Sequence, residues 1–159
     1  MRRLGLWLAL LTLGAAGAEK YSGPVPPKPD LLYLLHADNL IETESAEARQ
    51  QKRKNDDVYI VTGASSPART PLAEPILLMR SEKIMPQDLE LYRLEVRGGN
   101  RESVFPQNKR NWPRSFRLVV TRLDERLYRL EVSENLGLEN GEYLLTPRGS
   151  NQAFCFTVY

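Results

Sequence analysis

Residues 91–96 spell LYRLEV, and residues 127–132 spell LYRLEV again. In the first copy the apolar residues Tyr92, Leu94 and Val96 alternate with a mostly charged set. This period of two is typical of a β-strand with one face in a core and the other in water. We therefore predict an amphipathic strand at each copy.

The repeat itself ends at the hexapeptide. RGGNRESVF follows the first copy and SENLGLENG follows the second, so the flanks do not match. A duplicated module would match over a longer span. The two copies are better explained as two separate strands built from the same strand-forming residues.

The rest of the chain follows the same alternating pattern. Turn-forming residues such as Gly98-Gly99-Asn100 separate short apolar segments, which is typical of hairpins. Many short strands with polar turns predict an all-β, antiparallel sandwich that forms a single domain over residues 31–159. The predicted strands, including both copies of LYRLEV, are residues 31–36, 58–62, 76–80, 89–97, 101–105, 116–122, 127–133, 143–146 and 153–159.

One segment departs from this pattern. Residues 43–57, TESAEARQQKRKNDD, form a run rich in charge and poor in large apolar side chains. Such a composition predicts a solvated helix or a disordered linker inserted near the start of the domain.

The segment LENGEY, residues 138–143, narrows the fold class further. Leu138, the turn residue Gly141 and then Tyr143 at the start of a strand resemble the tyrosine corner of immunoglobulin-like sandwiches. That resemblance implies that the Tyr143 hydroxyl bonds to backbone a few residues upstream. The chain departs from the antibody pattern, because its single cysteine, Cys155, has no partner for a disulfide. We expect Cys155 to serve as a small apolar residue of a strand rather than as a reactive thiol.

The first residues predict export. Arg2 and Arg3 precede an apolar run, and Ala16-Gly17-Ala18 is typical of a signal peptidase site, so residues 1–18 are predicted to be a signal peptide. Its apolar run is too short for a transmembrane helix. Residues 19–30 follow as a proline-rich extended arm. With the ending GEYLLTPRGSNQAFCFTVY, these features resemble uncharacterised exported bacterial proteins, and the predicted location is periplasmic or secreted.

The net charge of the chain argues against nucleic acid as a partner. The full chain has 22 Lys and Arg against 20 Asp and Glu, and removal of Arg2 and Arg3 leaves these numbers equal. A nearly neutral domain lacks the basic footprint that binds nucleic acid through its phosphates. The expected partner is another exported protein or a cell-surface glycan, and the arm offers a route to oligomers by adding a strand to a neighbouring sheet.

Catalytic signatures are missing from the sequence. The predicted mature chain has one histidine, His36, and lacks the motifs of serine hydrolases, zinc proteases and phosphate-binding loops. The run Asn55-Asp56-Asp57 lacks the spacing of a calcium loop. We therefore predict a non-catalytic module without metal or cofactor. A glycan-acting enzyme that uses paired carboxylates stays an alternative, because that chemistry leaves no short motif.

The candidate ligand site is the loop NKRNWPR, residues 108–114. Three cations surround an indole there, and Pro113 keeps the loop out of regular structure. An indole can stack on a sugar ring while the cations meet an acidic group. The alternative is that the indole plugs one end of the sandwich. The candidate binding residues are Lys109, Arg110, Trp112 and Arg114.

A membrane-inserted alternative comes from the ending FCFTVY. Aromatic final strands also close outer-membrane β-barrels, and the length allows eight strands. Against this, several predicted strands are shorter than a membrane crossing needs, and aromatic girdles are not evident.

Overall fold

The computed structural model describes residues 20–133 and 137–159, and the predicted signal peptide lies outside these residues. The described chain is built from β-strands with two short 3₁₀ helices, Pro86–Asp88 (η1) and Lys109–Asn111 (η2). Apart from the short β6, the strand pairs are antiparallel, which confirms the all-β prediction. Each of the nine predicted segments overlaps a strand. The strands are β1 (Leu32–His36), β2 (Asn39–Glu42), β3 (Glu44–Glu47), β4 (Arg49–Arg53), β5 (Asp56–Val61), β6 (Arg69–Thr70), β7 (Ile76–Arg80), β8 (Leu89–Arg97), β9 (Asn100–Phe105), β10 (Leu118–Arg122), β11 (Leu127–Val132), β12 (Gly141–Pro147) and β13 (Gln152–Val158).

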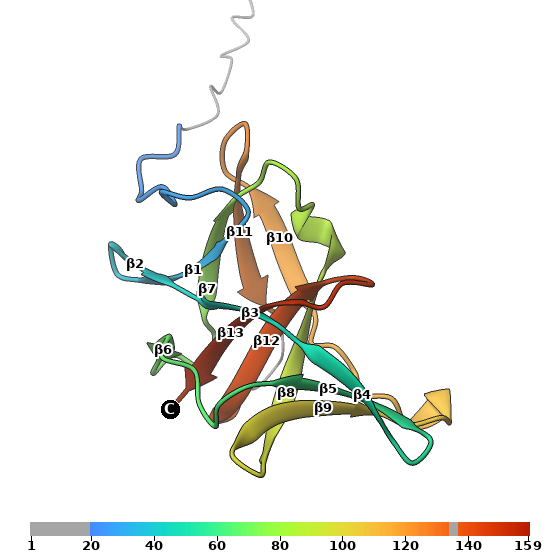
Figure 1. The fold of residues 1–159 in the computed structure, drawn as a ribbon. Helices are drawn as coiled ribbons and strands as arrows, with labels where there is room; N and C mark the ends of the chain where they lie inside the picture. Colours follow the sequence, from blue (N-terminus) through green and yellow to red (C-terminus); the bar gives the residue numbers. More distant parts are fainter. Residues whose placement is uncertain (1–19, 134–136) are drawn as a thin grey trace, which may run out of the picture.

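The strands form two sheets, with the orders β10-β11-β7-β1-β2 and β3-β13-β12-β8-β9-β5-β4 (Figure 1). Within them, the runs β10-β11-β7-β1 and β13-β12-β8-β9 follow the strand order of an immunoglobulin-type sandwich. The main core joins the two sheets. Each large side chain buried there stabilises the fold by roughly 1.5–3 kcal/mol relative to an exposed one. The buried side chains of this core include Leu32, Leu77, Met79 and Leu130 from one sheet and Leu91, Leu145, Phe154 and Phe156 from the other.

Tyr143 occupies the position expected for a tyrosine corner. Its hydroxyl donates to the backbone carbonyl oxygen of Glu139, four residues upstream, at 2.8 Å. Its ring is buried and stacks on Phe156 with the centroids 5.6 Å apart. Leu138 is buried in the main core, and Gly141 begins β12 where a Cβ would press on the Arg93 side chain. These contacts fix the start of β12 against the core.

The prediction of a helix or linker over residues 43–57 is wrong. Strands β3 and β4 occupy most of this segment, with only Ala48 between them. Strand β3 pairs with β13, whereas β4 pairs with β5 at the other end of the same sheet. Backbone partners at both edges thus override the charged composition. Residues 44–53 thus supply both edge strands of the sheet, and the sheet curls (Figure 1). A second cluster of buried side chains lies inside this curl and is called the second interior below.

This second interior combines an apolar cluster with buried charge. Leu94, Leu144 and Cys155 belong to the cluster. Arg101, whose side chain is wholly buried, bonds through its guanidinium to Glu44 and to the carbonyl oxygens of Thr62 and Gly63. The carboxylate of Glu142 accepts from Ser65, the backbone N–H of Ser66 and Thr157. Buried ions of this kind must be paired and hydrogen-bonded, and these are.

The end of the predicted arm is attached to its own sheet. The backbone N–H of Asp30 donates to the carbonyl oxygen of Arg80, and the Arg80 guanidinium donates to the carbonyl oxygen of Pro27. The Asp30 carboxylate accepts hydrogen bonds from three consecutive backbone N–H groups. Residues 27–30 therefore lie against the end of β7 in the same molecule.

Candidate functional site

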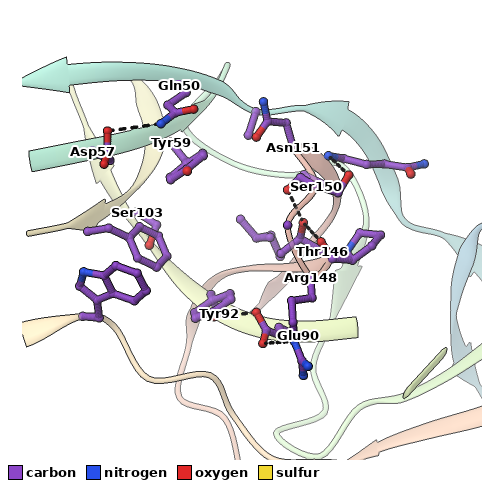
Figure 2. Close-up of a pocket in the computed structure, with 18 residues that line it drawn as sticks. Gln50, Asp57, Tyr59, Glu90, Tyr92, Ser103, Thr146, Arg148, Ser150 and Asn151 are labelled. Atoms are coloured by element: carbon purple, nitrogen blue, oxygen red, sulfur yellow. Dashed lines mark hydrogen bonds and ion pairs between the residues drawn. The ribbon is translucent and has the colours of Figure 1, made fainter. Parts of the chain in front are cut away.

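A cleft of about 800 Å³ opens at the end of the curled sheet, between the β4–β5 hairpin, the strands β8 and β9, and the turn from β12 to β13. Figure 2 shows Gln50, Asp57 and Tyr59 on one side of it and Thr146, Ser150 and Asn151 on the other. Strand alternation explains the lining, because every second side chain points to the same face of a sheet. The lining pairs are Asp57 and Tyr59 on β5, Glu90 and Tyr92 on β8, Ser103 and Phe105 on β9, Leu144 and Thr146 on β12, and Gln50 on β4 with Ala48 just before that strand.

Four aromatic side chains gather in this cleft. Phe105 lies at their centre and meets Tyr59, Tyr92 and Trp112 edge to face, with ring centroids 5.4, 5.9 and 5.4 Å away. Edge-to-face contacts of this kind contribute about 0.5–1.5 kcal/mol per pair beyond burial. The four rings are therefore held in fixed orientations by one another.

Of the four rings, that of Trp112 is the most open to solvent, with 44 % of the residue's surface exposed. Its indole Nε1 donates to the carbonyl oxygen of Pro106 at 2.8 Å. The ammonium group of Lys109 lies 5.5 Å from the centre of its ring. The indole is thus oriented by a hydrogen bond and a neighbouring ring while a large part of its surface stays accessible.

The other residues of the predicted loop lie differently. Lys109 and Arg110 belong to η2 and are exposed, and the backbone N–H of Arg110 bonds to the Asn108 side chain. Arg114 is also exposed. Of the four candidate residues only Trp112 lines the cleft. Lys109 contacts the Trp112 ring but does not itself line the cleft.

The cleft also carries charge, arranged in compensated pairs. The carboxylate of Asp57 lies 2.9 Å from Lys52 Nζ and accepts a hydrogen bond from Gln50. The hydrogen bond from Lys52 lowers the pKa of Asp57 despite some loss of solvation. On the opposite side Glu90 accepts from Arg148 at 3.2 Å and from the Tyr92 hydroxyl at 2.9 Å (Figure 2).

Tyr92 is a fixed donor in this arrangement. Burial and the hydrogen bond to Glu90 raise the pKa of Tyr92 to about 12, so its hydroxyl keeps its proton at neutral pH. The cleft therefore offers a hydroxyl, amides, carboxylates and a guanidinium around an aromatic cluster. These are the donors and acceptors that a polar, uncharged ligand needs.

Sequence reasoning found Trp112 but missed its partners. Tyr59, Tyr92 and Phe105 lie in three different predicted strands, and Arg148 lies between the last two predicted strands. A usable signal was present, because each of these aromatic residues is separated by one residue from a polar lining residue. This alternation shows which side chains share one face of a strand, but it does not show which strands lie next to each other in the sheet.

Two further features concern the described residues only. Residues 20–133 and 137–159 contain no cluster of three or more His, Cys, Asp and Glu side chains placed to hold a metal ion. The same residues form no helix that is long and apolar enough to cross a membrane.

The chain matches no protein-family model, no curated protein and no solved structure. The expected similarity to exported bacterial proteins thus stays a prediction.

Proposed function

We propose that this chain is an exported, non-catalytic binding module of immunoglobulin-like fold, and that it binds a carbohydrate in the aromatic cleft. The observation that carries the proposal is the gathering of four rings and several paired polar groups in one cleft. A cell-surface glycan is the corresponding partner outside the cytoplasm, and residues 1–18 support export through their signal-peptide pattern.

The aromatic side chains suit the apolar faces of sugars. A pyranose ring presents C–H groups on its faces, and these pack on the electron-rich face of an aromatic ring. Trp112 provides the largest and most accessible such surface. Because Phe105 and Pro106 hold the indole in place, little side-chain entropy is lost on binding.

The polar groups suit sugar hydroxyls, which act as donor and acceptor at once. Glu90 and Asp57 accept hydrogen bonds, and Arg148 and Gln50 donate them. Since each carboxylate is already neutralised by a cation, the cleft favours a neutral ligand over a strongly charged one.

The same pairs favour binding over catalysis. A glycosidase needs a carboxylic acid whose pKa is raised so that it is protonated when it meets the substrate. In this cleft the pKa of Asp57 is lowered by Lys52, and Glu90 is bound to Arg148 and Tyr92. Neither group is arranged as a general acid.

The fluorescence of Trp112 provides the test. The sequence has two tryptophans, Trp7 and Trp112, so a chain that starts at Glu19 carries only the reporter in the cleft. Titration with cello-, chito- and malto-oligosaccharides should change its emission for at least one series. Trp112→Ala should abolish binding measured by calorimetry, and Arg114→Ala, outside the cleft, should leave it intact.

Two results would count against the proposal. One is that none of the three series binds the folded chain. The other is release of reducing sugar from a bound glycan, which would show an enzyme. The urea midpoint of Trp112→Ala separates loss of binding from loss of fold.

A further inference from the structure

A second, smaller hollow of about 360 Å³ adjoins the cleft on the far side of the β12–β13 turn. Its lining consists of Ala46 and Glu47 from β3 and of Ser150, Asn151 and Gln152. Those last three residues also line the aromatic cleft. The two hollows thus share one wall, and a ligand longer than the cleft can continue across it.

The shared segment is fixed in its backbone and open in its side chains. The carbonyl oxygen of Asn151 accepts from the N–H of Ala48 at 2.8 Å, and the N–H of Gln152 bonds to the Ser150 hydroxyl at 3.1 Å. Throughout the described parts of the chain, nothing bonds to the side-chain amides of Asn151 and Gln152, and both residues are exposed. Rigid backbone with unused amide groups is suited to binding a ligand without refolding.

The chemistry of the two hollows differs. The cleft contains four aromatic rings, whereas the second hollow is lined by a carboxylate, two amides and a hydroxyl with no ring among them. A ring stacks on one face of a sugar, while amides and carboxylates bond to hydroxyl groups at its edge. The two hollows therefore suit successive units of one chain.

We propose that the cleft and the second hollow together bind a linear oligosaccharide, with one unit against Trp112 and later units over Asn151 and Gln152. This inference rests on the proposed function and adds that the ligand is an extended chain rather than a single sugar. Affinity should rise with chain length until the second hollow is filled.

The test compares chain lengths in the series that binds, from one to six units, by calorimetry. For the wild-type chain, affinity should increase at least about tenfold from the shortest binding unit to the longest, equivalent to about 1.4 kcal/mol. Glu47→Ala, at a residue that lines the second hollow and not the cleft, should bind short units as the wild type does and lose part of the gain for long ones. Ser45→Ala, at an exposed residue of β3 that lines neither hollow, is the matched surface control.

Each outcome decides something different. Equal affinity for all lengths, or a Glu47→Ala variant that weakens short and long ligands alike or keeps the full gain for long ones, overturns the extended-chain inference while the proposed function stands. Absence of binding at every length overturns the proposed function and this inference with it. Because the Glu47 side chain is exposed, the urea midpoint of Glu47→Ala should equal that of the wild type.

Discussion

Arg101 and Glu44 are joined by two parallel hydrogen bonds of 2.6 and 2.8 Å, although the Arg101 side chain is wholly buried. The pair links β9 to β3 inside the curled sheet. Burial alone would raise the pKa of Glu44, but hydrogen bonds from Arg101 and Ser66 outweigh it, so the pKa is lowered and the carboxylate stays charged. The network thus keeps two opposite charges in the interior.

Breaking this pair should be costly. Arg101→Leu leaves Glu44 without its partner and two carbonyl oxygens without a donor, so the free energy of unfolding should fall by about 3–5 kcal/mol. Arg101→Lys keeps the charge but loses the bidentate contact, so its free energy of unfolding should lie between those of the wild type and Arg101→Leu. Urea unfolding followed by circular dichroism measures the change.

The control for this prediction is an exposed ion pair. Lys28 lies 3.0 Å from Glu42 at the surface, and Lys28→Ala should leave the urea midpoint almost unchanged. An Arg101→Leu variant as stable as the wild type would show that the buried network does not stabilise the fold.

A second prediction concerns the tyrosine corner. Tyr143→Phe keeps the buried ring but removes the hydroxyl that bonds to Glu139, which should lower the free energy of unfolding by about 1–2 kcal/mol. Tyr159→Phe, at an exposed tyrosine, should have no such effect. Equal urea midpoints for the two variants would contradict a stabilising role for the corner.

A third prediction concerns acid. Burial alone would raise the pKa of Asp30, but hydrogen bonds from the backbone of Ile84, Glu82 and Lys83 lower it below its ordinary 3.8. Its contribution to stability is therefore present above about pH 3.8 and is lost as pH falls through the native pKa. Asp30→Asn keeps an acceptor and tolerates the positive φ of this position, but it removes the charge.

The measurement for Asp30 is the urea midpoint between pH 7 and pH 2. At pH 7 the variant should be less stable by about 1 kcal/mol, and the two curves should converge at the acid end. Asp38→Asn, in an exposed turn, should follow the wild type at every pH. A constant gap down to pH 2 would mean that the charge of Asp30 is not responsible.

The fourth prediction concerns Cys155. Burial raises the pKa of this thiol to about 12, and the residue has no exposed surface. It should not react with a thiol reagent at pH 8 in the folded chain, but one thiol per chain should react in denaturant. Rapid reaction of the folded chain would show that the second interior opens readily.

The two copies of LYRLEV show what alternation predicts and where it stops. In β11 the core side chains Leu130 and Val132 fall on the predicted face. In β8 both faces are partly buried, because Leu91 faces the main core while Leu94 faces the second interior. Val96, predicted to be inside, is 54 % exposed. The same six letters have different surroundings because β8 belongs to the sheet that curls.

The charged segment was mispredicted for a related reason. Ala46, Ala48 and Gln50 point inward in turn, and this alternation of small residues is a weak signal beside the many charges around it. Residues of β3 become a strand by pairing with the edge of β13, and those of β4 by pairing with the edge of β5. Both edges exist only once the whole sheet has formed.

Of the four aromatic residues in the cleft, the sequence analysis predicted one, Trp112, as a site residue. Trp112 stood out because it lies among cations in a proline-containing loop. Tyr59, Tyr92 and Phe105 looked like ordinary strand residues, since their closeness depends on the order β8-β9-β5. The order of these segments along the sequence does not give the order of the strands in the sheet.

The stretch that borders both ends of the curled sheet also sets an order of events in time. Ala46 pairs with Ala153, so this contact joins parts of the chain about a hundred residues apart, and contacts of such separation form slowly. During synthesis or export, strand β3 must wait for β13. The cleft, whose lining includes Gln152 and Ala153 of β13, is complete only after every preceding strand has emerged, so it closes late in folding.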